Sequence, residues 1–317
     1  MDFQHREKSP CDLCGGMDFK PVWNRGHPGV FLPTVLCRTC GLVQTNPRPT
    51  REELSEFYAK DYRVLYSGAA IPNEHARQGM KAQARSRYAE VDHLLPAGSH
   101  VVEIGCATGE FLAELAAHGH VPVGIEASPE CAALARATGA EVRAGLIEDQ
   151  EFARGSFDSV CMFHVLEHLT SPRRSLGIIR QWLKPGGILF IEVPDVAQPY
   201  HGNLSRFFQI AHNWSYSAAT LGALLQVAGY RPSWARRLVE GKFLRMIAVR
   251  PNVQDPVEIR FPTDGAERMQ SDLRRWRLKW LLWYKWRDII LAGIALPMRI
   301  VRRITRILSG QGDTRGR

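Results

Sequence analysis

Four of the seven cysteines fall in two Cys-x-x-Cys pairs near the N-terminus, a spacing that suits metal binding. Cys11 and Cys14 form the first pair, Cys37 and Cys40 form the second, and a glycine follows each pair. Two such turns can present four thiolates to one tetrahedral zinc ion, in a closed site that is structural rather than catalytic. A dithiol redox pair is the alternative, but the matching glycines favour zinc. We therefore predict a small zinc ribbon over residues 1–47.

A second chemical feature is the run VVEIGCATGEFL at residues 101–112, where a strand, a glycine-rich turn and a helix follow one another. Gly105 and Gly109 allow the backbone to pass close to a ligand, and the helix that opens near Glu110 offers free N–H groups to an anion. The third glycine of a dinucleotide-binding G-x-G-x-x-G is absent. Ala107 fits this turn as long as its φ is negative.

An acidic residue, Glu126, ends the next strand, about twenty residues after the turn, where a carboxylate can accept hydrogen bonds from ribose hydroxyls. Ser128 and Pro129 suit the N-cap and first position of a following helix, so ordinary helix capping is a compatible interpretation. Cys106, within the turn, is either a reactive thiol or a small buried filler, and we favour the filler.

The elements that position these residues alternate strand and helix, which predicts a parallel sheet with crossover helices. Expected strands are 100–104, 121–126, 141–144, 157–163 and 187–193, and expected helices are 109–119, 128–138 and 172–183. A helix at 217–228 and strands at 231–239 and 243–250 close this domain, which we assign to residues 97–250. A helical lead-in covers 48–96, with a short helix capped by Thr50 and running to about Lys60, and a longer one over 74–95. Residues 251–271 are expected to be a linker.

The charge distribution separates the body from the C-terminal segment. The chain has 317 residues and a net charge of +9, and residues 272–317, with twelve Lys/Arg and three Asp/Glu, account for all of this net charge. Residues 1–271 are therefore neutral, whereas a domain that grips nucleic acid usually has a basic surface. This balance makes nucleic acid an unlikely partner.

The glycine-rich run and the segments that follow it resemble the class I S-adenosylmethionine-dependent methyltransferases. GIEAS at 124–128, GLIEDQEF at 145–152, FDSVCMFHVLEHLTSP at 157–172 and LKPGGILFIEVPD at 183–195 match that family in order. The resemblance implies an α/β fold with a Rossmann-like seven-stranded methyltransferase domain, here with a small N-terminal zinc ribbon and a C-terminal amphipathic helical segment. The implied cofactors are S-adenosylmethionine and a structural Zn²⁺.

The resemblance also implies which residues surround the cofactor. Leu146, Ile147 and Glu148 would frame the adenine ring, while Phe163 and His164 would line the methionine end. The complete expected cofactor set is Glu103, Gly105, Cys106, Ala107, Gly109, Glu126, Ala127, Leu146, Ile147, Glu148, Phe163 and His164.

Catalytic candidates follow the fourth strand, at the carboxyl edge of the sheet where ligands bind. His164, Glu167 and His168 can supply a base or, with Glu167, hold a divalent metal, although a turn that only braces the cofactor loop is an equal alternative. In related enzymes a histidine-containing run before the late helix comes near the acceptor, which makes His212 the first choice for the general base. Asp195 ends the fifth strand, where it either faces the substrate or caps the strand.

The C-terminal segment, residues 272–317, combines positive charge with apolar residues at helical spacing. It contains Trp276, Trp280, Trp283 and Trp286, then Ile300, Val301, Ile304, Ile307 and Leu308 opposite Arg299, Arg302, Arg303 and Arg306. This pattern is typical of a helix that lies on an anionic membrane. A helical arm that packs on the body or on a dimer partner is the alternative, and a nucleic-acid contact is less favoured. The uncharged run 289–298 is too short to span a bilayer, and Pro297 should kink or end the helix.

The segment after the second cysteine pair sharpens the resemblance to a ribbon-bearing methyltransferase subgroup that acts on sugars and surface polysaccharides. HVLEHL is also similar to ubiquinone-pathway O-methyltransferases, and the large C-terminal domain of sugar C-methyltransferases is missing. We therefore predict methyl transfer to an oxygen of a glycan, a lipid-linked sugar or a lipid. The alternatives are a ribosomal-RNA methyltransferase with a zinc module and a cofactor-binding scaffold without catalysis.

The first twenty residues lack a secretory signal, so we expect a cytoplasmic protein, with the C-terminal tail peripheral on the cytoplasmic face of the membrane.

Overall fold

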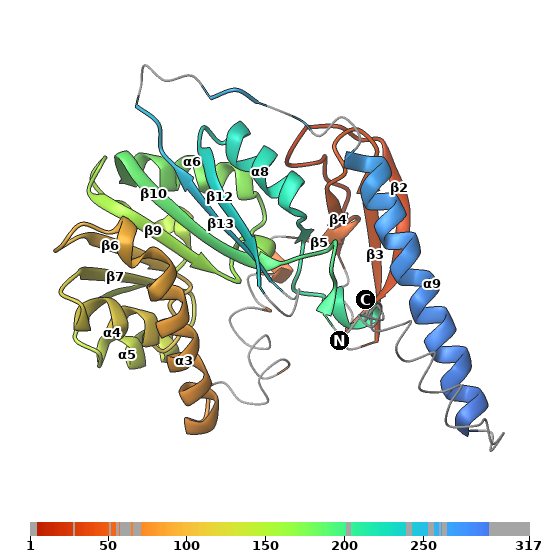
Figure 1. Cartoon of the computed structure of the whole chain (residues 1–317), viewed down its shortest axis with the longest axis horizontal. Coiled ribbons are helices and arrows are strands. Elements are labelled where there is room, and N and C mark those ends of the chain that lie inside the picture. The colour runs from red at the N-terminus through yellow and green to blue at the C-terminus, as the bar shows by residue number, and fades with distance from the viewer. Residues whose placement is uncertain are drawn as a thin grey trace, which may run out of the picture.

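The structure is a computed structural model in which the chain forms two sheets flanked by helices, with one long helix at the end (Figure 1). It describes residues 5–27, 29–50, 52–54, 57, 65, 71–200, 204–238, 243–252, 257–259, 261 and 265–291. In the last helix the side chains are described up to Leu282, and also at Trp286.

The larger sheet has seven strands in the order β12-β13-β10-β9-β6-β7-β8. The parallel strands are β6 (His100–Ile104), β7 (Val121–Glu126), β8 (Glu141–Ala144), β9 (Phe157–Phe163) and β10 (Leu183–Pro194). The hairpin of β12 (Arg231–Arg237) and β13 (Phe243–Val249) adds antiparallel pairs beyond β10. The strand order reverses between β6 and β9, and such a switch point is where open α/β sheets bind ligands.

Helices cover both faces of this sheet (Figure 1). α6 (Pro172–Trp182) and α8 (Ala218–Val227) pack on one face through an apolar core that includes Leu176, Ile179 and Leu224. On the other face lie α3 (Glu74–Val91), α4 (Glu110–Ala117) and α5 (Pro129–Arg136). β6, β7, β9 and β10 are buried on both sides along most of their length, which explains their continuous apolar runs. These elements confirm the predicted Rossmann-like fold.

The helix ends follow local capping chemistry. Asn73 accepts the Ala76 N–H at the start of α3, and the Ser128 hydroxyl accepts the Cys131 N–H at the start of α5. α3 runs into a 3-10 turn, η1 (Asp92–Leu94), as expected from the helix predicted before Pro96. The Thr50 hydroxyl accepts the Glu53 N–H at 3.4 Å, as predicted for an N-cap, whereas the predicted end at Lys60 lies outside the described residues.

The second sheet contains the predicted ribbon but is not confined to residues 1–47. β2 (Phe19–Gly26), β3 (Val30–Cys37) and β4 (Val43–Thr45) form an antiparallel sheet, and β11 (Trp214–Ser215) pairs with β4 at its edge. We call these four strands and the four paired cysteines the ribbon. The β2–β3 hairpin occupies the long spacer between the cysteine pairs. β1 (Arg6–Glu7) and β5 (Arg48–Pro49) form a separate two-stranded antiparallel sheet, and in the sequence they flank β2, β3 and β4.

The ribbon is joined to the larger domain at the start of α6. Asp12, between the first two cysteines, accepts the Arg173 N–H at 2.7 Å and the Ser171 hydroxyl at 2.9 Å. A carboxylate at this position satisfies a free N–H of the first helical turn and favours the positive end of the helix dipole. Arg48 donates to the Thr170 carbonyl at 2.7 Å and lies over the ring of Trp214. The ribbon and the larger domain are therefore joined by these contacts at the start of α6 and by β11, which pairs with β4.

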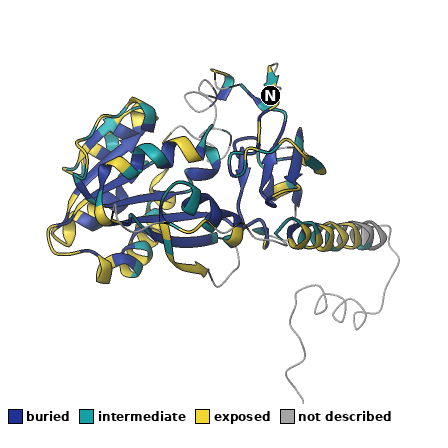
Figure 2. Cartoon of the chain, turned by 90° about the horizontal axis from the view of Figure 1, so that it is seen from above, coloured by how far each residue is buried: buried dark blue, intermediate teal, exposed yellow. Residues whose placement is uncertain are grey.

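The last helix, α9 (Gly265–Leu291), begins within residues 251–271, which the sequence assigned to a linker. Met269 and Leu273 are buried, and the indole of Trp276 donates to the Ala197 carbonyl, so packing on the body orders this part of the helix. Farther along, the helix stands out from the body with an exposed surface (Figure 2). Among the described residues no helix is long and apolar enough to cross a membrane. Pro297 and the apolar stripe at 300–308 lie outside the described residues.

Candidate active site and cysteine cluster

The glycine-rich turn between β6 and α4 is strongly bent. Gly105, Ala107 and Gly109 all have positive φ, at 73°, 49° and 85°. The expectation that Ala107 keeps a negative φ is therefore wrong. A left-handed conformation costs a residue with a Cβ about 1–2 kcal/mol. The compensating contact is a hydrogen bond of 2.9 Å from the Ala107 N–H to a carboxylate oxygen of Glu126.

Glu126 holds the turn with both of its carboxylate oxygens. The second oxygen accepts the Ser128 N–H at 2.9 Å, so the side chain links the turn to the start of α5. Ala127, the next residue, is exposed. This geometry is compatible with helix capping and also with ribose binding by Glu126. After it accepts one N–H bond, each carboxylate oxygen still has a lone pair that can accept a hydrogen bond from a ribose hydroxyl.

The two glycines of the turn are required by close packing as well as by φ. A Cβ at Gly105 would lie 2.5 Å from a methyl group of Val165, and one at Gly109 would lie 3.0 Å from the Cα of Ala135. The first contact brings the turn directly against the loop that follows β9. The glycine-rich turn and the histidine-containing loop are thus neighbours, as expected for adjacent parallel strands.

Glu103 and Cys106 are both buried beside the turn. Burial raises the pKa of Glu103 to about 8, with Glu110 and Glu126 adding to the shift and Arg87 opposing it. One Glu103 carboxylate oxygen has no hydrogen-bond partner in the described part of the chain. Burial also raises the pKa of the Cys106 thiol, which supports the interpretation of this residue as a filler rather than a reactive group.

The residues expected at the adenine ring point in different directions. Leu146 is 37% exposed, while Ile147 is 2% exposed and belongs to the apolar core. Glu148 accepts a hydrogen bond of 2.7 Å from the Ser175 hydroxyl on α6. Leu146 is therefore the member of this group with the most side-chain surface available for a ligand.

The four predicted catalytic residues come together in space. His164 Nε2 lies 3.1 Å from Glu192, and its Nδ1 lies 3.4 Å from Glu167. His168 Nε2 lies 4.0 Å from the same Glu167 oxygen, and the rings of His168 and His212 have centroids 4.8 Å apart. Glu167 and His168 belong to the 3-10 turn η3 (Leu166–His168), so one short turn supplies two members of the cluster.

The histidines differ in charge because their surroundings differ. Burial alone would lower the pKa of His164, but its contacts with Glu167 and Glu192 outweigh burial and raise the pKa to about 9. For His212, burial and the neighbouring His168 outweigh the attraction of Glu167 and lower the pKa to about 3. Burial also lowers the pKa of His168, while the interaction with His164 keeps the pKa of Glu167 below its usual value. At neutral pH His164 is an imidazolium and His212 is a neutral imidazole.

The carboxylate of Glu167 is 1% exposed and accepts no hydrogen bond of good geometry from the described residues. Glu167, His168 and His212 each offer one ligand atom, and these atoms lie within 4.8 Å of one another. Two neutral imidazoles and a carboxylate are a donor set that suits a divalent first-row metal. The same arrangement equally suits proton transfer.

A buried ionic network behind His164 was not anticipated from the sequence. Glu192, on β10, pairs with Arg87 and Arg245, and Arg245 also pairs with Glu90 at 2.6 Å. The hydrogen bond with His164 and the charge of Arg87 keep the pKa of Glu192 low despite burial. The one signal in the sequence was an acidic residue inside an otherwise apolar strand, ILFIEVP.

Asp195 is fully buried and acts as a cap at the end of β10. Its carboxylate accepts the Ala197 N–H at 2.9 Å and pairs with Arg237. This supports the strand-capping interpretation over a role facing substrate.

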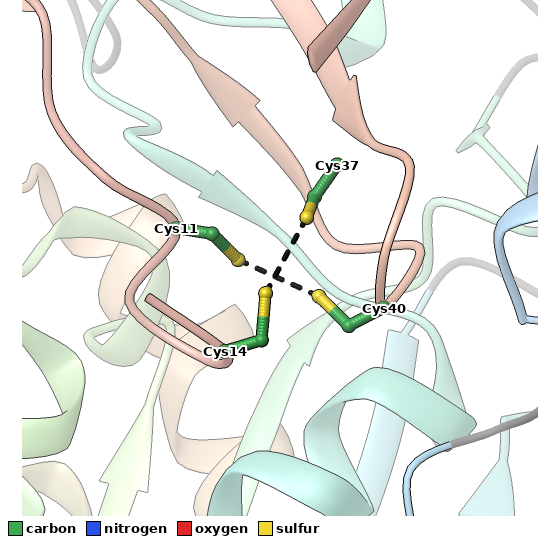
Figure 3. Close-up of side chains that lie close together, drawn as sticks. All are labelled: Cys11, Cys14, Cys37 and Cys40. Atoms are coloured by element: carbon green, nitrogen blue, oxygen red, sulfur yellow. Dashed lines mark hydrogen bonds between the residues drawn. The ribbon is translucent and has the colours of Figure 1, made fainter. Parts of the chain in front are cut away.

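The four paired cysteines converge, with their sulfur atoms pointing toward one another (Figure 3). The Sγ atoms of Cys11 and Cys40 are 3.5 Å apart, as are those of Cys14 and Cys37, and all four lie within 4.8 Å. A tetrahedral site with zinc–sulfur bonds of about 2.3 Å requires sulfur separations of about 3.8 Å. The four thiols therefore fit a zinc ion, and their separations are far longer than the disulfide bond of about 2 Å.

Each cysteine pair lies on a tight turn that ends in a glycine with positive φ. Gly15 N–H donates to the Cys11 carbonyl and Gly41 N–H to the Cys37 carbonyl. A Cβ at Gly41 would lie 2.7 Å from the backbone of Gly265, so α9 starts directly against the second turn.

Comparison with known proteins gives one family and several relatives. Residues 74–232, half of the chain, match the family model described as "Methyltransferase domain". O-methyltransferase cnsE of Penicillium expansum is 33% identical over 145 residues, which are 42% of this chain and 52% of that protein. A ubiquinone biosynthesis O-methyltransferase of Xanthomonas axonopodis pv. citri (strain 306) is 34% identical over 105 residues, 31% of this chain and 44% of that protein. The chain thus spans about half the length of these curated relatives.

A solved structure is also similar. The 1,6-didemethyltoxoflavin-N1-methyltransferase of Burkholderia thailandensis, with 1,6-didemethyltoxoflavin and S-adenosylhomocysteine bound, has a TM-score of 0.53 at 19% identity. The match covers 67% of this chain and 96% of that chain, and it is a likeness of fold.

Proposed function

The chain belongs to the methyltransferase-domain family, and on this premise we propose that it transfers the methyl group of S-adenosylmethionine to an oxygen of a glycan, a lipid-linked sugar or a lipid. The observation that carries the proposal is the neutral, buried imidazole of His212 beside His168 and Glu167. An oxygen acceptor agrees with the names of the curated relatives, both of which are O-methyltransferases.

In this proposal the bent turn of residues 105–109 and Glu126 bind the nucleoside part of the cofactor, with Leu146 against the adenine. Glu103 faces the positively charged end, where its buried carboxylate can be stabilised by a cation. His164 remains charged through Glu167 and Glu192, and it orients the loop next to Gly105. When bound, the cofactor supplies an electrophilic methyl group on a positively charged sulfur.

His212 accepts the proton that the acceptor hydroxyl loses as its oxygen takes the methyl group. Glu167 lies within the same cluster, and its negative charge stabilises the imidazolium that forms on His212. His168, whose Nδ1 lies 2.9 Å from the Ala211 carbonyl, holds its ring against that of His212. A positioned base of this kind contributes about 10²–10⁴-fold to a rate.

We propose a structural zinc ion for the four cysteines of the ribbon. A closed Cys₄ site leaves no open coordination position, so the metal would stabilise the fold of the ribbon and take no part in the chemistry.

The proposed base is tested with His212→Asn and a matched control, His120→Asn. His120 is also a buried histidine, but it contacts Tyr88 on the opposite face of the sheet. Transfer of labelled methyl to fractionated lipid and glycan extracts identifies the acceptor fraction, and calorimetry measures cofactor affinity. We expect His212→Asn to lower kcat about 10²-fold or more with cofactor affinity unchanged, and His120→Asn to retain the wild-type kcat. Equal rates for the two variants would refute the role of His212, and absence of heat with S-adenosylmethionine or S-adenosylhomocysteine would refute the cofactor.

α9 supports a peripheral membrane contact as the second part of the proposal. Leu278, Leu281 and Leu282 are 59%, 41% and 42% exposed and share one face of the helix, away from the packed Leu273. Arg274, Arg275 and Arg277 are exposed beside them. Exposed leucines next to arginines are suited to an anionic lipid surface, where each buried leucine contributes about 1.5–3 kcal/mol.

The membrane contact is tested by flotation with anionic vesicles. A variant with Leu278→Ser, Leu281→Ser and Leu282→Ser keeps the packed face of α9 intact, and we expect its vesicle-bound fraction to fall at least tenfold. The control carries Met17→Ser and Val121→Ser, which remove two exposed apolar side chains elsewhere, and it should bind like the wild type. Equal flotation of the triple variant and the control would remove the membrane contact from the proposal.

A further inference from the structure

A ribbon side chain, that of Thr45, is hydrogen-bonded to the segment that carries the proposed base. We infer that Thr45, on the last ribbon strand before the methyltransferase domain, is a positioning residue that holds His212 beside His168. This inference rests on the proposed function, because it concerns the residue proposed as the base. It assigns the ribbon a part in acceptor activation in addition to its fold.

Thr45 makes two hydrogen bonds to the segment that carries His212. Its hydroxyl donates to the His212 carbonyl at 3.0 Å, and its backbone N–H donates to the Asn213 carbonyl at 2.9 Å. Thr45 is 4% exposed, so water does not readily replace either bond. Immediately beyond, Trp214 and Ser215 form β11 and pair with β4 of the ribbon. The backbone of His212 is therefore bonded to the edge of the ribbon sheet.

The opposite side of the same segment is bonded to the turn that carries His168. The Asn213 N–H donates to the Glu167 carbonyl at 2.9 Å, and its side-chain amide donates to the His168 carbonyl at 3.0 Å. The indole of Trp214 donates to the Leu169 carbonyl at 2.7 Å. Residues 212–214 thus join the ribbon to η3, and the distance between the His168 and His212 rings depends on contacts from both sides.

The cysteine cluster is close to Thr45 in the chain and in the sheet. The turn between β3 and β4 carries Cys37 and Cys40, and β4 begins at Val43. A zinc ion at the four thiols would fix this turn to the turn of Cys11, and so would fix the register of β4. Loss of the metal is expected to loosen β4 and, through Thr45, the position of His212.

The test compares three substitutions of similar size. Thr45→Val removes the hydroxyl and keeps the shape and the backbone bond, whereas Thr45→Ser keeps the hydroxyl. Thr34 is the cross-strand partner of Thr45, is equally buried, and donates its hydroxyl to the Leu32 carbonyl within the ribbon. Thr34→Val is therefore a control for loss of a buried threonine hydroxyl in the same sheet that does not contact His212.

The measurements are kcat and KM, cofactor affinity, bound zinc, and the imidazole resonances of ¹⁵N-labelled histidine. The His212 resonances are assigned from their absence in His212→Asn. For Thr45→Val we expect kcat to fall about tenfold, cofactor affinity and zinc content to stay within twofold of wild type, and the His212 resonances to shift. Thr45→Ser and Thr34→Val should keep kcat within about threefold of wild type and leave the His212 resonances in place.

The positioning role is overturned if Thr45→Val and Thr34→Val have equal kcat and both leave the His212 resonances unchanged. It is also overturned if Thr45→Ser loses as much activity as Thr45→Val. Failure of the proposed function gives a different pattern, because His212→Asn would then leave kcat unchanged. The resonance shift in Thr45→Val needs no acceptor, so it supports or overturns the positioning contact in either case.

Discussion

Glu103→Gln tests whether the acid at the end of β6 is held protonated in the folded protein. Glu103 is 4% exposed, and burial raises its pKa from 4.5 to about 8. Between these two pKa values the folded state binds a proton that the unfolded state has lost, so stability falls as the pH rises. The loss is about 1.4 kcal/mol per pH unit, or about 3 kcal/mol between pH 5.5 and 8.

Glutamine has the shape of the protonated acid but does not titrate. Wild type and Glu103→Gln should have the same free energy of unfolding only well below pH 4.5, where Glu103 is protonated in both the folded and the unfolded state. At pH 5.5 the unfolded wild type is already ionised, so the variant should be the more stable by about 1.4 kcal/mol. Between pH 5.5 and 8.5 this difference should grow by about 3 kcal/mol, because the unfolded state stays ionised while folded Glu103 keeps its proton up to about pH 8. Urea unfolding at pH 5.5, 7 and 8.5 measures this difference, with the pH 5.5 pair as the reference.

Cofactor binding provides a second readout of the same group. A cation placed beside Glu103 lowers its pKa, so binding of S-adenosylmethionine at pH 7 should release close to one proton from the wild type and none from Glu103→Gln. Calorimetry in buffers of different ionisation enthalpy counts these protons. The reasoning on Glu103 is refuted if wild type and variant show the same dependence of stability on pH between 5.5 and 8.5.

Three further substitutions test contacts that the structure identifies. Asp12→Ala removes the carboxylate at the start of α6 and should lower the free energy of unfolding by about 1–2 kcal/mol, which urea unfolding would detect; an unchanged midpoint would contradict this capping role. Arg245→Ala leaves Glu192 with one buried partner fewer and should cost about 3–5 kcal/mol, and a loss under 1 kcal/mol would show that the network is not strongly coupled. The raised pKa of His164, about 9, contributes stability that is complete below pH 6.5 and is lost as the pH rises through 9. His164→Gln should remove this dependence between pH 6.5 and 9 in thermal unfolding, and a slope equal to that of wild type would contradict the charged state of His164.

Several features were predictable from short stretches of sequence. The alternation of strands and helices, the glycine-rich turn and the two cysteine pairs each depend on residues within about ten positions of one another. Local periodicity and capping therefore identified β6 to β10, β12 and β13, and also α3 to α6 and α8, with end points within a few residues, apart from the longer β10. The short α7 (Leu204–Phe207) and β11 were not predicted. The conformation of Ala107 was not predictable in this way, because its positive φ is stabilised by Glu126 on the next strand.

The proposed catalytic cluster shows this limit of local sequence reasoning more clearly. The sequence identified His164, Glu167, His168 and His212 one by one, but it did not show that His212 would be neutral and His164 charged. That difference comes from the contacts of His164 with Glu167 and with Glu192, which reaches it from a neighbouring strand, and from the burial of His212 beside His168. A pKa depends on burial and on charges a few ångströms away, and neither is contained in the identity of the residue.

By itself the sequence determined the order of the elements, the turn that can hold a nucleoside and the four thiols that can hold a metal. Only the tertiary structure joined Thr45 to His212, added β11 to the ribbon and placed α9 against the turn of Gly41. The physical reason is that propensity, capping and periodicity act between near neighbours in the chain. Pairing between segments more than 150 residues apart is instead decided by which surfaces can be buried together with their backbone hydrogen bonds satisfied.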